Sequence, residues 1–60
     1  MQIIDSQTKT FVCEVITNGT KTIDEILKLM DIAVDDEGQL YDELNQKYIN
    51  AWYDNLITID

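Results

Sequence analysis

The sequence predicts a small single domain of the α+β class, with an N-terminal β element packed against two helices. Three observations indicate this fold: a β-branched run near the N-terminus, a capped amphipathic segment after it, and aromatic residues at helical spacing in the second half. The 60 residues suffice for one domain, 1–60. Because 45% of them are apolar, the chain can bury a core and is not a disordered acidic tail.

The N-terminal β element consists of two predicted strands. Residues 9–17 are rich in β-branched residues, and Glu14 alone interrupts the second face of this strand. Residues 2–4 are predicted to form a shorter partner strand, joined to the first by a polar turn. Asn18 and Gly19 indicate a further turn, since both residues tolerate positive φ.

Residues 22–34 are predicted to form the first helix. Thr22 and Glu25 have the spacing of a capping box, in which each side chain accepts a hydrogen bond from the other residue's amide. The apolar residues of this segment fall on one stripe of a helix: Ile23, Ile26, Leu27, Met30 and Val34. The end of the helix is expected within residues 30–34.

Residues 35–38 predict a turn, and residues 39–55 are predicted to form the second helix. Four residues of this segment recur at helical spacing: Tyr41, Leu44, Tyr48 and Trp52. The alternative is a set of short strands with turns at residues 42–46 and 54–55, because asparagine and aromatic residues are mediocre helix formers. Residues 56–59 are β-rich and form a candidate C-terminal strand, expected beside residues 9–17.

The charge of the chain is strongly negative and uneven. Twelve acidic residues against four lysines give a net charge of −8. Residues 31–60 hold eight of the acids and one lysine, a net of −7. Direct binding to nucleic acid or to an anionic membrane is therefore disfavoured, since both require a basic surface. The expected partner is a basic protein surface, in particular that of a nucleic-acid-binding protein.

Six acidic residues in the second half are candidate partner-binding residues: Asp31, Asp35, Asp36, Glu37, Asp42 and Glu43. They could mimic a row of phosphates, or they could form a solvated face that only keeps the protein soluble. A calcium-binding loop is not expected: aligning Gly38 with the glycine of an EF-hand puts Ala33 and Leu44 at ligand positions. The absence of histidine also disfavours a zinc site, so no metal is predicted.

The predicted second helix has more apolar surface than one core contact needs. Trp52 is expected to face the core, and Ile49 and Tyr53 extend the apolar arc to the far side of the helix. Either the helix is sandwiched between other elements, or the far side binds a partner. Ile49 and Tyr53 therefore join the candidate binding residues.

The sequence predicts neither an enzyme nor a cofactor. Histidine, arginine and glycine-rich loops are absent, and 60 residues leave little material for a catalytic cleft. Cys13 lies within an apolar run and is expected to be a buried, inert thiol. The single cysteine, with no secretory signal or membrane span, indicates a cytoplasmic protein.

In size, sign of charge and lack of catalytic residues, the chain resembles the small acidic inhibitors that phages and mobile elements encode. These include DNA-mimic anti-restriction proteins, anti-CRISPR proteins and uracil-DNA glycosylase inhibitors. The resemblance is one of composition and covers no motif. It implies an inhibitor or regulator that blocks the nucleic-acid-binding site of a nuclease or DNA-binding protein. The alternative is a homo-oligomeric structural or accessory module, such as a homodimer, without mimicry.

Overall fold

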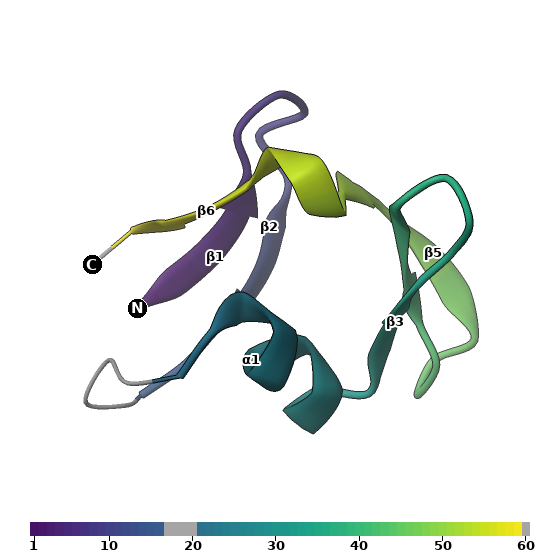
Figure 1. Cartoon of the computed structure of the whole chain (residues 1–60), viewed down its shortest axis with the longest axis horizontal. Helices are drawn as coiled ribbons and strands as arrows, with labels where there is room; N and C mark the ends of the chain where they lie inside the picture. Colours follow the sequence, from purple (N-terminus) through teal and green to yellow (C-terminus); the bar gives the residue numbers. More distant parts are fainter. Residues whose placement is uncertain (17–20, 60) are drawn as a thin grey trace.

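A computed structural model describes residues 1–16 and 21–59 of the chain. These residues form two three-stranded antiparallel sheets and one α-helix (Figure 1). The elements follow in this order: β1 (Gln2–Asp5), β2 (Phe11–Glu14), α1 (Ile23–Leu29), β3 (Ile32–Val34), β4 (Gln39–Asp42), β5 (Lys47–Trp52), the 3₁₀ turn η1 (Tyr53–Asn55) and β6 (Leu56–Ile59). The predicted α+β class is confirmed, and the second predicted helix is wrong.

The first sheet has the strand order β2-β1-β6, and both pairings are antiparallel. β1 and β2 confirm the predicted N-terminal β element, and β6 confirms the predicted C-terminal strand. β2 is shorter than the predicted strand of residues 9–17 and begins after Lys9, which has a φ of 63°. The predicted place of the C-terminal strand, beside residues 9–17, is wrong. The hairpin that joins β1 to β2 fills one edge of β1, so β6 pairs with the other edge. The turn predicted at Asn18 and Gly19 lies outside the described residues.

The helix α1 begins where the sequence predicts and ends early. Thr22 and Glu25 form the predicted capping box: the Glu25 amide donates to the Thr22 hydroxyl at 3.2 Å, and the Thr22 amide donates to the Glu25 carboxylate at 3.4 Å. The helix stops at Leu29 instead of within residues 30–34. Asp31 has a φ of 57°, a left-handed conformation that cannot continue a right-handed helix, and β3 follows directly.

The second sheet, with the order β3-β4-β5, takes the place of the helix predicted for residues 39–55. The alternative of short strands with turns at residues 42–46 and 54–55 is confirmed. Tyr41 and Tyr48 are seven residues apart, as in two helical turns, but they lie directly opposite each other on β4 and β5. Aromatic residues stabilise such cross-strand pairs, which explains why the sheet forms here.

The core draws on both sheets and on α1. In Figure 1 the first sheet lies on the left, the second on the right, and α1 at the bottom between them. The buried apolar residues come from all three: Ile3, Ile26, Leu27, Leu40, Ala51 and Leu56. No helix in the described part of the chain has the length and apolar character needed to cross a membrane.

A buried carboxylate joins the two sheets. Asp5, at the end of β1, has no exposed surface. One of its oxygens accepts hydrogen bonds from the amides of Gln7 (2.7 Å) and Thr8 (2.9 Å). The other accepts from the Trp52 amide (2.8 Å), at the end of β5, and from the Asn55 side chain (3.5 Å). Asp5 therefore holds its own turn and fastens the first sheet to the second.

Burial alone would raise the pKa of Asp5, because it penalises the charged form. The hydrogen bonds from Thr8, Trp52, Gln7 and Asn55 favour the charged form and together outweigh burial, so the pKa lies below its ordinary value. A further bond reinforces the same junction, as the Thr8 hydroxyl donates to the Asn50 carbonyl at 2.7 Å.

Candidate functional site

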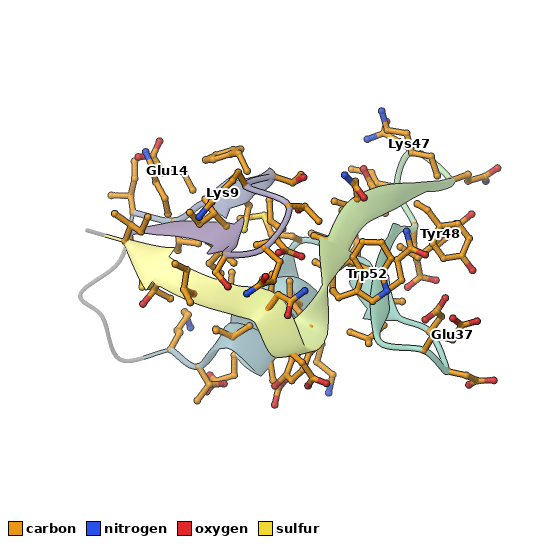
Figure 2. The ribbon with its side chains drawn as sticks, turned by 90° about the horizontal axis from the view of Figure 1, so that it is seen from above. Lys9, Glu14, Glu37, Lys47, Tyr48 and Trp52 are labelled. Carbon is orange, nitrogen blue, oxygen red and sulfur yellow. The ribbon has the colours of Figure 1, made fainter. Side chains whose placement is uncertain are left out.

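Three aromatic side chains, two of them in contact, lie on the outer side of the second sheet. Tyr41 is opposite Tyr48, and their rings meet edge to face with centroids 4.9 Å apart. Trp52 follows on β5, opposite Gln39, and Figure 2 shows Tyr48 and Trp52 in the same half of the molecule. We call Tyr41, Tyr48 and Trp52 the aromatic face.

Strand alternation explains why these residues share a face. Successive side chains of a strand point to opposite sides of the sheet. On β5, Ala51 is buried and Ile49 packs against the core, so Tyr48 and Trp52 point outward. Among the described residues, those that pack against the core include no member of the aromatic face. Tyr48 keeps 55% of its surface exposed, which leaves its ring available for a contact.

Acidic residues border the aromatic face at the β3–β4 turn. Asp36 and Glu37 are exposed there, and we call them the turn acids. Asp35 stabilises the turn itself, because its carboxylate accepts hydrogen bonds from the amides of Glu37 and Gln39, both at 2.9 Å. The Gly38 carbonyl accepts from the Tyr53 amide at 2.7 Å, which holds the turn beside the Trp52 end of the aromatic face.

A second acidic group lies at the other end of the same sheet. Asp31 and Glu43 are exposed and adjacent, with the Glu43 amide donating to the Asp31 carbonyl at 3.0 Å. We call them the base acids. Asp42 follows on β4, opposite Lys47 of β5. Its carboxylate stabilises the β4–β5 turn, because it accepts a hydrogen bond from the Asn45 side chain at 2.8 Å.

The pKa of Asp42 is lowered chiefly by the hydrogen bond from the Asn45 side chain. Hydrogen bonds from the amides of Asn45 and Leu44 and the charge of Lys47 act in the same direction, against the effect of burial. The carboxylate therefore stays ionised in its turn. Its bonds are internal, so it has less capacity to bind a partner than the base acids have.

The six predicted acidic residues thus do not form one continuous row. The four residues of β4 separate the two groups by about 14 Å, at about 3.4 Å per residue. Asp35 and Asp42 stabilise turns, and the other four project at the two ends of the aromatic face. The four exposed acids are divided in pairs: Asp36 and Glu37 lie in the β3–β4 turn, and Asp31 and Glu43 lie at the opposite end of the sheet.

The two predicted apolar binding residues, Ile49 and Tyr53, both pack against the core. The Tyr53 hydroxyl also donates a hydrogen bond to the Asp24 carboxylate at 2.5 Å. That bond, with burial and the charges of Asp24 and Asp54, raises the pKa of the Tyr53 phenol. The packing is the reverse of the sequence expectation, in which Trp52 faced the core and Tyr53 faced the partner.

Tyr41, Tyr48 and Trp52 were not among the predicted binding residues. The signal that identifies them is the strand alternative for residues 39–55: alternation along β5 separates Tyr48 and Trp52 from Ile49 and Ala51. A helical reading of the same residues places Tyr41, Tyr48 and Trp52 on the core side. The error in secondary structure therefore carried over to the choice of binding residues.

Two other features lie outside this surface. Cys13, predicted to be buried, is only half-buried opposite Ile3, and this burial raises the pKa of its thiol. An open groove runs along α1, lined by Lys21, Glu25, Lys28 and Leu29. Within residues 1–16 and 21–59, no three or more histidine, cysteine or acidic side chains are grouped so that they could hold a metal ion.

No protein-family model, no curated protein and no solved structure matches the chain. The aromatic face and its acidic ends are therefore interpreted from their own geometry and chemistry.

Proposed function

We propose that the chain is a protein-binding inhibitor or regulator, without catalytic activity, that docks its aromatic face onto a basic surface of its partner. One observation carries the proposal. Tyr41, Tyr48 and Trp52 all lie outside the core on the second sheet, with the two tyrosine rings in contact, and exposed carboxylates lie at both ends of that sheet.

Aromatic side chains outside the core are suited to anchor a protein contact. Tyrosine and tryptophan dominate binding energy at interfaces, because each buries a large area at low entropic cost. Their faces also attract the cationic groups of arginine and lysine, and this attraction strengthens as water is excluded. Tyr48, the most exposed of the three, is the expected centre of the contact.

The acids at the two ends select the partner. The turn acids and the base acids attract lysine and arginine, speed association with a basic partner and repel acidic competitors. Exposed ion pairs contribute little affinity each, so the carboxylates supply specificity and the aromatic rings supply most of the binding energy.

The narrower form of the proposal concerns the identity of the partner. A nucleic-acid-binding protein has clustered lysine and arginine side chains at its functional site. A chain with a net charge of −8 is drawn to such a site and, once bound, excludes nucleic acid from it. The single cysteine fits a reducing compartment, so the partner is sought in the cytoplasm.

Trp52 is the only tryptophan in the chain, so its fluorescence reports directly on the aromatic face. Titration with an arginine-rich peptide at low salt should change this fluorescence in a saturable way. Tyr48→Ala should weaken the binding by more than about tenfold, as expected for an interface anchor. Phe11→Ala, which removes a ring of similar exposure from the first sheet, is the matched control and should bind like the wild type.

The natural partner can be captured from a bacterial lysate with the tagged protein and released by steps of salt or by competing duplex DNA. Release of a basic nucleic-acid-binding protein by DNA supports the narrower form, and the Tyr48→Ala bait should fail to capture it. An equal response of the Tyr48→Ala and Phe11→Ala variants, in either assay, would remove the aromatic face from the proposal.

A further inference from the structure

The first sheet presents an outer face that differs in charge from the rest of the molecule. Residues 1–16 carry three charged side chains, and residues 56–59 carry none. Asp5 is buried, so the exposed charged side chains within residues 1–16 and 56–59 are Lys9 and Glu14, whose charges are opposite. Figure 2 shows Lys9 and Glu14 in one half of the molecule, with Glu37 and Trp52 in the other.

The outer face of this sheet is apolar at its centre. Ile4 alternates with the fully buried Ile3 and Asp5, so its side chain points outward. On β2 its partner is Phe11, and on β6 its partner is Ile57. The β1–β2 register shifts between Ile3 and Ile4, and beyond this shift Ile4 and its two partners form a row across the sheet.

A second row lies beside the first, with Gln2 opposite Glu14 on one side and Ile59 on the other. The exposed fractions are 54% for Phe11, 43% for Ile57 and 42% for Ile59. The face therefore exposes three large apolar side chains at neighbouring positions, with Lys9 and Glu14 at its margin.

We propose that this face, centred on Phe11, Ile4 and Ile57, binds the same face of a second copy of the chain to form a homodimer. In this dimer, a two-fold axis through the apolar centre places the two sheets face to face, with the strands of one copy running opposite to those of the other. Lys9, in the turn before β2, then lies near Glu14 of the second copy, and Glu14 lies near Lys9 of the second copy.

Charge identifies a second copy as the occupant. A two-fold contact requires a self-complementary patch, and this face carries one cation and one anion on either side of an apolar centre. Two chains of net charge −8 repel each other, and the repulsion is smallest where they meet through a surface with few charges. Contact through the first sheet also keeps the acidic ends of the second sheet away from the axis and leaves both aromatic faces open.

The small size of the face makes the dimer weak. Its three strands have four residues each, which gives a sheet surface of about 14 Å by 10 Å at ordinary strand spacing. This is well below the area of about 800 Å² per partner that a standard interface buries. The dimer is therefore expected to dissociate on dilution.

Sedimentation equilibrium over a concentration series tests the proposal. The average mass of the wild type should rise from 7.0 kDa towards twice that value as concentration increases. Phe11→Lys and Ile57→Lys should each raise the dissociation constant about tenfold or more, because an unpaired ammonium would be buried in the contact. Circular dichroism checks that each variant is folded.

Leu44→Lys, at a residue with 75% exposure in the β4–β5 turn, makes the same change in net charge away from the face. Because it reduces repulsion between chains, it should leave the dissociation constant unchanged or lower it. Lys9→Glu and Glu14→Lys should each weaken the dimer several-fold, and the double exchange should restore it.

A wild type that stays at 7.0 kDa throughout the series would overturn the proposal, as would equal effects of Ile57→Lys and Leu44→Lys. Failure of the double exchange to restore the dimer would overturn the two-fold arrangement. None of these results bears on the peptide titration of the aromatic face, because that site lies on the other sheet.

Discussion

The two sheets of this molecule contribute inner faces of the same kind and outer faces of different kinds. Both give apolar side chains to one core, for example Ile3 from the first sheet and Leu40 from the second. Outside, the first sheet is apolar and carries few charges, and the second carries two tyrosines and a tryptophan between exposed carboxylates. The comparison indicates that a chain of 60 residues can present two outer faces of different chemistry, because its core needs only one side of each sheet.

The largest expected effect comes from a change in the core that both sheets share. Leu40 is fully buried, and Leu40→Ala should lower the free energy of unfolding by about 2–5 kcal/mol, through lost burial and a cavity. Urea unfolding followed by Trp52 fluorescence and by far-ultraviolet circular dichroism measures the change. If the two signals separate, the two sheets unfold independently and the shared core is the wrong description.

Asp5→Asn tests the connection between the sheets. An asparagine has one carboxamide oxygen in place of two carboxylate oxygens. Either the amides of Gln7 and Thr8 or that of Trp52 therefore loses its acceptor. We expect a marked loss of thermal stability. Asp42→Asn is the matched control and should cost less, because its oxygen can still accept from the amides of Leu44 and Asn45.

Asp5 also predicts how stability depends on pH. Its pKa is lower in the folded chain than in the unfolded one, so its contribution is complete above the ordinary aspartate pKa. That contribution is lost as pH falls through the lowered value. Thermal melts of the wild type in this acidic range should fall more steeply with decreasing pH than melts of Asp5→Asn. If the melting temperatures of wild type and Asp5→Asn fell in parallel with decreasing pH, Asp5 would not be the source of this pH dependence.

A smaller effect, on peptide affinity, is expected from neutralising the acids at either end of the second sheet. Neutralising the turn acids with Asp36→Asn and Glu37→Gln should weaken binding of the arginine-rich peptide about three- to tenfold. The matched change at the base acids, Asp31→Asn and Glu43→Gln, should weaken it less, because Lys47 already offsets the charge at that end. Rising salt should remove both differences. A larger effect at the base acids would relocate the contact to that end.

The smallest expected effect concerns the hydrogen bond of Tyr53, which packs against the core while its neighbour Trp52 does not. Tyr53→Phe removes only the hydroxyl that donates to Asp24, so the protein should stay folded and lose a little stability. The pKa of Tyr53 is raised, so this contribution is present below the ordinary tyrosine value and is lost as pH rises through the raised one. A difference titration of tyrosinate absorbance between wild type and variant should place the Tyr53 transition above that of free tyrosine.

The parts of the fold that were predictable from sequence rest on local signals. The capping box needs only four consecutive residues, Thr22 to Glu25, and it was confirmed. The helix predicted for 39–55 failed because its spacing signal is ambiguous: residues seven apart can be stacked on a helix or paired across a hairpin. The mediocre helix formers in that segment favoured the hairpin, and they were the better guide.

The features that were not predictable depend on distant contacts. Asp5 reads as an ordinary turn residue in a polar stretch, and its burial follows from the Trp52 amide, 47 residues away. The division of the acids between two ends of a sheet follows from the pairing of β3, β4 and β5, which the charge pattern does not specify. The sequence therefore indicated an acidic half of the molecule without indicating how its carboxylates are arranged.

The hydrogen bonds of Asp5 also have a consequence for the order of folding. The β1–β2 hairpin and the β3-β4-β5 meander connect residues close in sequence, so they can form early at little loop-closure cost. The bond from Trp52 to Asp5 and the pairing of β6 with β1 close loops that span most of the chain. We expect these contacts to form after the rate-limiting step. Asp5→Asn should then accelerate unfolding and leave the folding rate almost unchanged.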